Sequence, residues 1–432
     1  MSIFDPKHET MSRDELQQHQ LEKLQAVLNR AIRNVAYYRK WFKDAELLPD
    51  DFRSLDDLRK VPLTSRATLV ENHPYGMFAV PLRQVIRLHP IQTRGGKQIV
   101  IGYTKNDVDN WTNLKARGFA AASVDEDDIL QVCLDYSLFP GALIAHYGAE
   151  VLGACVIPVY NVALEEQIPI MRNYRVTAVV CTPSHAFHIV QYLQENEIDP
   201  KSLFLHHIVL TGERWSTEQR KKIEDSLGVT VLGGYGVIEV CSPGIAFECE
   251  EQNGFHINED HFIPEIIDPK SGEVLPAGRE GELVLTTLTK EAFPLIRYRT
   301  GDITTLREET CACGRTTIKM ENITMRTDDR IVIGGAEISL QEVRSVLLEH
   351  EHVSSNFCLV ATSEQATDKL EIQVEVTSEM FGDEVKALED LRRRIETSIV
   401  ERLRIRPHVR LVEPRSLEGK PRIQDNRLKW PD

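Results

Sequence analysis

The sequence predicts an α/β fold: a large N-terminal domain of mixed, largely parallel sheets with flanking helices and a β-hairpin region, followed by a small C-terminal α+β domain. Three observations predict it. Strands and helices alternate through the middle of the chain, turn-linked strands follow residue 250, and a shorter mixed unit follows residue 329. At 432 residues the chain is also too long for one compact core, which indicates two or three domains. We place the boundary between domains 1–326 and 327–432, with "RTDDR" as the hinge.

Residues 12–47 are predicted to form a helix in the N-terminal domain. Apolar side chains recur there with the spacing of one helix face. These positions are Leu16, Leu21, Leu24, Val27, Leu28, Ile32 and Val35.

The middle of the chain alternates short apolar runs with amphipathic stretches. This order predicts right-handed crossovers and a largely parallel sheet that is covered on both faces. Ligands of such sheets sit beyond the carboxyl ends of the strands, so "LTGERW" and "LGGYGVIE" are candidate site loops. The predicted strands are "DILQVCLDY", "CVIPVY", "VTAVVCTP", "HHIVLTGE" and "VTVLGGYG", and the predicted helices are "GALIAHYGAEVLGA", "SHAFHIVQYLQENE" and "TEQRKKIEDSLG".

After residue 250 the pattern changes to hairpin-like strands joined by Pro/Gly turns, "FIPEIIDPKSGEVLP" and "GELVLTTLT". The small C-terminal domain then mixes strands and helices. Its predicted elements are the hairpin "DRIVIGGAEI", the helix "SLQEVRSVLLEH", the strands "NFCLVAT" and "LEIQVEVT", a helix over 383–404 and the strand "HVRLVEP".

Composition excludes several classes of protein. A formal charge of −15 argues against nucleic acid or an anionic membrane as a partner, because both repel an acidic surface. No apolar run approaches the roughly 20 residues that span a bilayer. The segment "MSIFDPKHETMSRDELQQHQ" is too polar for a signal peptide, and eight cysteines in so long a chain do not indicate a disulfide framework. We therefore expect a cytoplasmic protein.

An ordered set of motifs carries a resemblance to a known family. The set comprises "LFPGALIAHYGAE", "GGYGVIEV", "IIDPKSGEVLPAGREGELVLTTLTKEAFPLIRYRTGD", "CACGRT", "MRTDDRIVIGG" and "LEGKPRIQDN". Together these motifs resemble the phenylacetate–CoA ligase family of adenylate-forming enzymes. The resemblance implies an AMP-forming acid–CoA ligase that activates an aryl or small organic acid with ATP and Mg²⁺ and transfers it to CoA. It also implies a mobile C-terminal lid domain, and a homodimer is common among relatives.

The resemblance assigns roles around the nucleotide. Glu239 matches the acidic residue that holds Mg²⁺ against the phosphates, which suits a hard oxygen ligand. Asp302 in "YRTGD" matches the aspartate that binds the ribose hydroxyls, and Arg326 matches a nucleotide contact. The family usually has Ser or Thr before the acidic residue, whereas this chain has Ile238.

The C-terminal motifs imply a second set of roles. Lys420 in "EGKPR" matches the lysine that bridges the acid carboxylate and the α-phosphate, where a mobile ammonium offsets the gathering negative charge. Asp328 matches the hinge residue about which the small domain rotates. Gly335 in "IGGAE" matches the position where the pantetheine chain passes close to the backbone.

The family also indicates where the acid and the adenine bind. Tyr136, Phe139 and Ala142 fall where the aryl pocket is built, although apolar residues equally suit an ordinary core. The adenine is covered near "TGERW", and the nucleotide lies beside "GGYG". The candidate residues in those two motifs are Gly212, Glu213, Tyr235 and Gly236.

A second constellation consists of Cys249, His256, Cys311 and Cys313. Three thiolates and an imidazole form a closed set that suits structural Zn²⁺. Family members that share "CxCGRT" carry such a zinc, and four unrelated residues are the alternative. We expect the remaining cysteines that lie in apolar strands to belong to the core. These are Cys133, Cys155, Cys181 and Cys358.

The segment "IQTRGGKQ" (91–98) departs from the family, which has a Ser/Thr/Gly-rich phosphate loop there. Successive glycine N–H groups could still bind the phosphates as an anion-binding nest, and charged side chains could replace the hydroxyls. Alternatively, the loop has lost ATP chemistry. Two other interpretations therefore stay open: an adenylyltransferase with a different acceptor, and a non-catalytic relative that binds nucleotide or acyl-CoA. The loop residues assigned to ATP are Thr93, Arg94, Gly95, Gly96 and Lys97.

Overall fold

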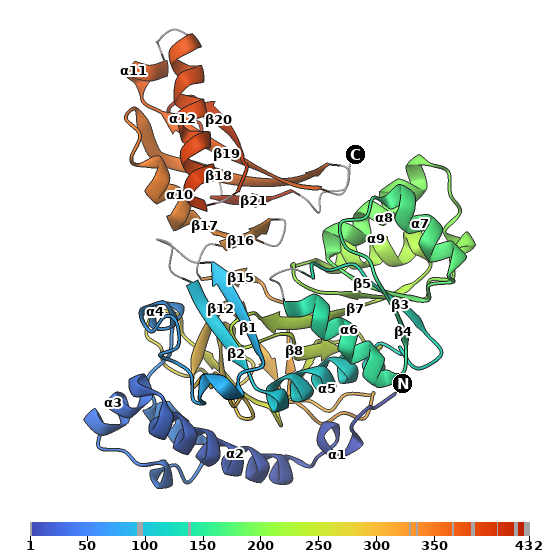
Figure 1. Ribbon diagram of the computed structural model, residues 1–432, viewed down its shortest axis with the longest axis vertical. Helices are drawn as coiled ribbons and strands as arrows, with labels where there is room; N and C mark the ends of the chain where they lie inside the picture. Colours follow the sequence, from blue (N-terminus) through green and yellow to red (C-terminus); the bar gives the residue numbers. More distant parts are fainter. Residues whose placement is uncertain are drawn as a thin grey trace. The chain divides into compact units, whose positions relative to one another are not determined.

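The computed structural model of the chain is shown in Figure 1. Two compact units divide it, an N-terminal unit, Met1–Thr327, and a C-terminal unit, Asp328–Asp432. The structure describes residues 2–92, 98–136, 140–327, 330–333, 336–364, 367–381, 385–403, 405–418 and 422–426.

The first long helical segment is two helices rather than the single helix predicted over 12–47. Val35 has an extended backbone (φ −104°, ψ 114°), which ends one helix and begins the next. Its side chain is fully buried in the main core, so packing favours the bend over a continuous helix. Ser12 and Glu15 form a capping box at the start of the first long helix. The helices are α1 (Pro6–Glu9), α2 (Arg13–Asn34) and α3 (Ala36–Asp44).

Short elements lead from these helices to the main sheet. Two strands pair as a separate antiparallel ribbon, and residues 93–97 between them lie outside the described residues. The elements are η1 (Pro49–Asp51), η2 (Leu55–Lys60), α4 (Arg66–Glu71), η3 (Leu82–Gln84), β1 (Arg87–Gln92) and β2 (Gln98–Tyr103).

A nine-stranded sheet forms the centre of the N-terminal unit, in the order β13-β14-β9-β8-β7-β6-β5-β3-β4. The strands β4, β3, β5, β6 and β7 are parallel, which confirms the predicted parallel sheet. Its strands are β3 (Ile129–Val132), β4 (Cys155–Pro158), β5 (Ala178–Cys181), β6 (His207–Leu210) and β7 (Thr230–Val237). The helices of this region are α5 (Lys105–Ala121), α6 (Pro140–Leu152), α7 (Leu164–Asn173), α8 (Pro183–Glu195), η5 (Pro200–Ser202) and α9 (Thr217–Leu227).

Of the cysteines assigned to the core, Cys133, Cys181 and Cys358 are buried, as expected, but Cys155 is exposed. Its strand, β4, is the last strand of the sheet and pairs only on one side, with β3. An edge strand of this kind is covered less completely than the strands inside the sheet, which explains the difference.

The antiparallel strands carry the hairpin region. β8 (Cys241–Glu248), β9 (Phe255–Ile257), β14 (Lys319–Met320) and β13 (Leu306–Arg307) extend the large sheet. A second, four-stranded antiparallel sheet has the order β10-β11-β12-β15 and includes both predicted hairpin strands. Its strands are β10 (Phe262–Ile267), β11 (Gly281–Thr287), β12 (Tyr298–Thr304) and β15 (Met325–Arg326).

The C-terminal unit has the predicted mixture of strands and helices around a core of its own. A hairpin is formed by β16 (Arg330–Ile333) and β17 (Ala336–Ser339). A four-stranded sheet has the order β20-β19-β18-β21. Its elements are β18 (Val353–Glu364), β19 (Thr367–Val376), β20 (His408–Val412), β21 (Ile423–Asp425), α10 (Leu340–Leu347), α11 (Ser378–Phe381) and α12 (Val385–Leu403).

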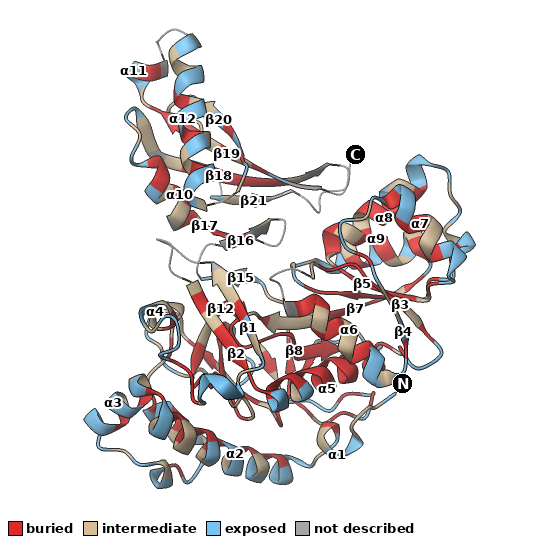
Figure 2. Ribbon diagram, in the orientation of Figure 1, coloured by how far each residue is buried: buried red, intermediate tan, exposed pale blue. Residues whose placement is uncertain are grey.

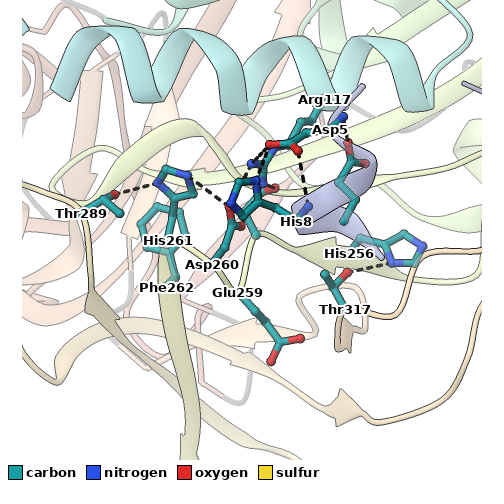
Figure 3. A network of polar contacts seen from close by, with 12 residues as sticks. Asp5, His8, Arg117, His256, Glu259, Asp260, His261, Phe262, Thr289 and Thr317 are labelled. Carbon is teal, nitrogen blue, oxygen red and sulfur yellow. Dashed lines mark hydrogen bonds and ion pairs between the residues drawn. The ribbon is translucent and has the colours of Figure 1, made fainter. Parts of the chain in front are cut away.

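Helix α5 is largely buried, as its mostly red ribbon in Figure 2 shows. Its buried residues include the charged Asp107, Lys115 and Arg117. Arg117 is bound by both carboxylate oxygens of Asp260 at 2.8 and 2.9 Å, and by Asp5 at 2.8 Å (Figure 3). Asp107 accepts the backbone N–H groups of Glu291 and Ala292. The buried charges of Arg117 and Asp107 are therefore compensated by partners.

In the part of the chain that the structure describes, no helix is both long enough and apolar enough to cross a bilayer.

Candidate active site

Three sequence-predicted residues meet around the carboxylate of Asp302. The Tyr235 hydroxyl donates to Oδ2 at 2.7 Å, and Nη1 of Arg326 donates to Oδ1 at 2.5 Å. Pairing of β12 with β15 sets Asp302 opposite Arg326. The register of the parallel sheet pairs Leu210, the last residue of β6, with Gly233, so Tyr235 lies beyond the carboxyl end of that strand. This is the edge where α/β sheets bind ligands.

Burial, together with the adjacent Asp302 carboxylate, raises the pKa of Tyr235 well above its usual value. The phenol therefore stays protonated at neutral pH and acts as a donor. Asp302 is 4% exposed and its charge is balanced by Arg326. We call Tyr235, Asp302 and Arg326 the Asp302 cluster.

Glu239 lies in the turn between β7 and β8 and is 3% exposed. Its Oε1 accepts a hydrogen bond from Nη1 of Arg66 at 2.7 Å. Arg66 begins α4, 173 positions away in the chain, and sequence analysis did not identify it. The buried carboxylate is a suitable oxygen ligand for Mg²⁺, and in this structure an arginine compensates its charge.

The backbone around this turn explains two sequence features. A Cβ on Gly236 would lie 2.5 Å from the carbonyl oxygen of Cys241, so only glycine fits where β7 folds back onto β8. Ile238, where the family usually has a hydroxyl residue, is partly buried and packs against the main core. Its side chain thus contributes apolar packing to the turn that holds Glu239.

The loop after β6 is held by Glu213. Its carboxylate accepts the backbone N–H of Ser184 at 3.0 Å and the Ser184 hydroxyl at 2.9 Å, in the first turn of α8. Gly212 has a φ of +86°, which glycine adopts without strain. In this structure Glu213 therefore positions the loop against α8.

The two described residues of the predicted acid pocket have different surroundings. Ala142, on α6, is fully buried in a core cluster that includes Phe119. Tyr136 is half-buried and packs against the same cluster. Its hydroxyl lies 3.2 Å from Nδ1 of His146, a polar neighbour that sequence analysis did not identify.

Several predicted site residues lie outside the described residues. They are Thr93, Arg94, Gly95, Gly96, Lys97, Phe139, Asp328, Gly335 and Lys420.

The four predicted zinc ligands form one buried cluster, with their ligand atoms all within 4.8 Å of one another. Sγ of Cys249 lies 3.7 Å from Sγ of Cys311 and 3.5 Å from Nε2 of His256, and Sγ of Cys313 lies 3.5 Å from the same nitrogen. With Zn–S near 2.3 Å and Zn–N near 2.05 Å, a tetrahedral ion separates two sulfurs by about 3.8 Å and a sulfur from a nitrogen by about 3.6 Å. These three separations match those of a tetrahedral Cys₃His site.

The surroundings of this cluster orient its imidazole. Nδ1 of His256 lies 3.2 Å from the Thr317 hydroxyl (Figure 3). Its other ring nitrogen, Nε2, therefore faces the thiols of Cys249 and Cys313. The hydrogen bond from Cys249 lowers the pKa of the Cys313 thiol. His256 lies in β9, and the other ligands come from the end of β8 and the loop after β13. A bound ion would therefore connect three strands of the large sheet.

Two family models match the chain. The AMP-binding enzyme model covers residues 101–288, and the AMP-binding enzyme C-terminal domain model covers residues 336–427. Curated relatives include the phenylacetate-coenzyme A ligase of Thermus thermophilus, 38% identical over 95% of this chain and 96% of its own. The Escherichia coli phenylacetate-coenzyme A ligase is 42% identical over 85% of this chain and 84% of its own.

Solved structures agree with this assignment. A 2-hydroxyisobutyryl-CoA ligase in complex with 2-HIB-AMP and CoA, in the thioesterification state, matches 97% of this chain and 91% of its own. The TM-score is 0.87 at 26% identity. Near-complete coverage by relatives of this identity, with both domain models matched in order, places the chain in the phenylacetate–CoA ligase family, whose members are AMP-forming acid–CoA ligases.

Proposed function

We propose that this enzyme activates a compact carboxylic acid, aryl or short-chain, in the N-terminal unit and passes the acyl group to CoA. The observation that supports this most directly is the Asp302 cluster, in which Tyr235 and Arg326 hold one buried carboxylate beyond the end of β6. The relatives are named for phenylacetate, and the solved structure contains the adenylate of a small hydroxy acid. Both acids are compact.

In this proposal Asp302 accepts hydrogen bonds from the two ribose hydroxyls. An ionised acceptor makes such bonds roughly twice as strong as a neutral acceptor does. Tyr235 and Arg326 orient the carboxylate, because each donates to a different oxygen. Glu239 is the proposed Mg²⁺ ligand, and the bound ion would supply positive charge to the nucleotide phosphates. Arg66 pairs with Glu239 and compensates its charge.

The reaction has two balanced steps. A carboxylate oxygen of the acid forms a bond to the α-phosphorus of ATP, and the bond to pyrophosphate breaks. The sulfur of CoA then bonds to the acyl carbon, the bond to AMP breaks, and the thiol proton is released. By resemblance, Lys420 offsets charge in the first step, Asp328 is the hinge and Gly335 borders the pantetheine path.

We further propose that Cys249, His256, Cys311 and Cys313 bind one structural zinc ion. The ligand separations and the orientation of His256 by Thr317 support this. Elemental analysis of protein purified without added metal tests it, with one zinc per chain expected. Less than a tenth of an equivalent, together with a melting temperature unaffected by a strong chelator, would contradict it.

ATP–pyrophosphate exchange tests the proposed ligase activity. A panel of aryl and short acids with Mg²⁺ is expected to show acid-dependent exchange. Lys420→Ala should abolish this exchange, whereas the control variant Lys221→Ala, at an exposed lysine, should retain it. Formation of acyl-CoA distinguishes a CoA ligase from an adenylyltransferase with another acceptor. No exchange with any acid, alongside calorimetric binding of ATP, would favour the non-catalytic interpretation. Light scattering on the same sample tests the expected homodimer.

A further inference from the structure

Lys115 is a buried lysine on α5 that the proposed nucleotide chemistry does not use. Its side chain is 3% exposed. The stem packs against α6, where a Cβ on Gly148 would lie 2.8 Å from Cγ of Lys115. The ammonium lies 4.1 Å from the centroid of the Phe119 ring. The glycine on α6 thus leaves space for the stem of this lysine, and the two helices lie side by side in Figure 1.

The charge of Lys115 lacks the compensation that its neighbours on α5 have. Among the residues that the structure describes, no carboxylate is within ion-pair distance of its ammonium, whereas Arg117 is paired with Asp260. Burial lowers the pKa of Lys115 to about 7. The ring of Phe119 offsets part of the desolvation through a cation–π contact, and among the described residues no group accepts a hydrogen bond from the ammonium. A buried ammonium without a charged partner lowers the stability of the folded protein, and a bound anion would reduce that loss.

The position of the ammonium connects it to the site. Nζ lies 3.8 Å from the point where a Cβ on Gly234 would stand, and the carbonyl oxygen of Leu210 lies 3.9 Å from the same point. Leu210 is the last residue of β6, and Gly234 directly precedes Tyr235 of the Asp302 cluster. Because Gly234 has no side chain, the ammonium of Lys115 faces the backbone of β7 beside the end of β6.

The residues proposed to border the acid lie on the same side. Phe119, whose ring contacts the ammonium, belongs to the core cluster that contains Ala142. Tyr136 packs against that cluster from the loop after β3. Lys115 therefore lies between the segment of β7 that carries Tyr235 and the core cluster that contains Ala142 of the predicted acid pocket.

We propose that Lys115 binds a second anionic oxygen group on the substrate acid, so that the enzyme prefers an acid with two carboxylates over its uncharged counterpart. This proposal rests on the proposed ligase function and names the substrate class. One carboxylate is adenylated, and the other meets the ammonium at the far end of the acid. The incoming charge compensates the lysine and completes its hydrogen bonds.

The experiment compares kcat/KM for matched acids in the exchange assay. The pairs are para-carboxyphenylacetate with para-methylphenylacetate, and adipate with hexanoate. The wild type is expected to favour the diacid of at least one pair. Lys115→Met gives an unbranched, uncharged side chain of similar length. It is expected to lower kcat/KM for that diacid by about 30-fold or more while the neutral acid is unchanged or improved, since removal of one partner of a buried charge pair has effects of this size. Lys115→Arg is expected to restore part of the preference, and Lys105→Met, at the exposed start of the same helix, to leave it unchanged.

The outcomes separate the two proposals. Exchange with no acid at all would refute the proposed function. Exchange with neutral acids only, or an equal loss for both members of a pair in Lys115→Met, would refute the role of Lys115 while the ligase function stands. If Lys115→Met does not fold, competition in the wild type decides, because the diacid must inhibit exchange of the neutral acid more strongly than a second neutral acid does.

Discussion

Replacement of Lys115 by methionine is expected to stabilise the protein in a way that depends on pH. Burial lowers the pKa of this lysine from its usual 10.5 to about 7, and no charged group among the described residues contributes to that change. Below pH 7 the folded protein therefore holds a buried charge that the unfolded chain exposes to water. The pKa is lower in the folded state, so the unfolded state binds the proton more tightly and stability rises with pH between about 7 and 10.5.

The magnitude follows from the two pKa values. The destabilisation by the protonated lysine is about 5 kcal/mol at pH 6 and falls to about 2 kcal/mol at pH 9. Methionine has a similar length and no charge, and it adapts to irregular space. Lys115→Met should accordingly exceed the wild type in free energy of unfolding by about 4 kcal/mol at pH 6, with the difference reduced by roughly half at pH 9.

Urea-induced unfolding at pH 6, 7.5 and 9 measures this difference. The fluorescence of Trp111, which is buried on the same helix, reports on the N-terminal unit. Lys105→Met serves as the control, because its side chain is exposed and no pH-dependent difference is expected. A difference between Lys115→Met and wild type that is constant with pH, or that grows as pH rises, would refute the assignment of Lys115 as an uncompensated buried cation.

The remaining predictions concern the other charged and metal-ligating groups. Asp302→Asn keeps the shape of the side chain but removes its charge, so the KM for ATP in the exchange assay should rise at least tenfold. The thermal midpoint of the C-terminal unit should not move, and an unchanged KM would exclude a ribose contact. Arg66→Ala leaves the buried Glu239 carboxylate uncompensated and should lower the free energy of unfolding by about 3 kcal/mol. The double variant with Glu239→Gln should recover most of that loss, and a loss that persists there would assign the effect of Arg66 to packing. Cys311→Ser should lower zinc content and thermal midpoint together, while Cys358→Ser, a buried cysteine of the C-terminal unit, should retain the zinc; retention of zinc in both variants would count against the proposed site.

Much of the fold could be predicted because it rests on local patterns. Apolar runs of strand length and amphipathic helices alternate in the middle of the chain, and the parallel sheet formed there as expected. The prediction of one helix over 12–47 was wrong because the apolar Val35 continues the helical pattern while its backbone bends into the core. The helices α5 and α7 were not predicted. Cys155 was misassigned because residue type does not reveal that its strand is the last of the sheet.

The candidate site was predicted unevenly, for a reason that its contacts make plain. Tyr235, Asp302 and Arg326 were found because each belongs to a distinctive motif, and the fold then brings them together. His146 and Arg66 belong to no such motif. The fold determines which residues they contact, so the local sequence around either residue does not reveal its partner.

The sequence by itself determined the family, the order of the elements and the residue types available for nucleotide and zinc binding, because these depend on composition, spacing and ordered motifs. Only the tertiary structure decided that Arg66 compensates Glu239 across 173 positions, and that Lys115 is buried without a carboxylate among the described residues. The physical reason is that burial and charge compensation are properties of an environment assembled from several segments. A lysine in an amphipathic helix has the same appearance in sequence whether water or a protein core surrounds it.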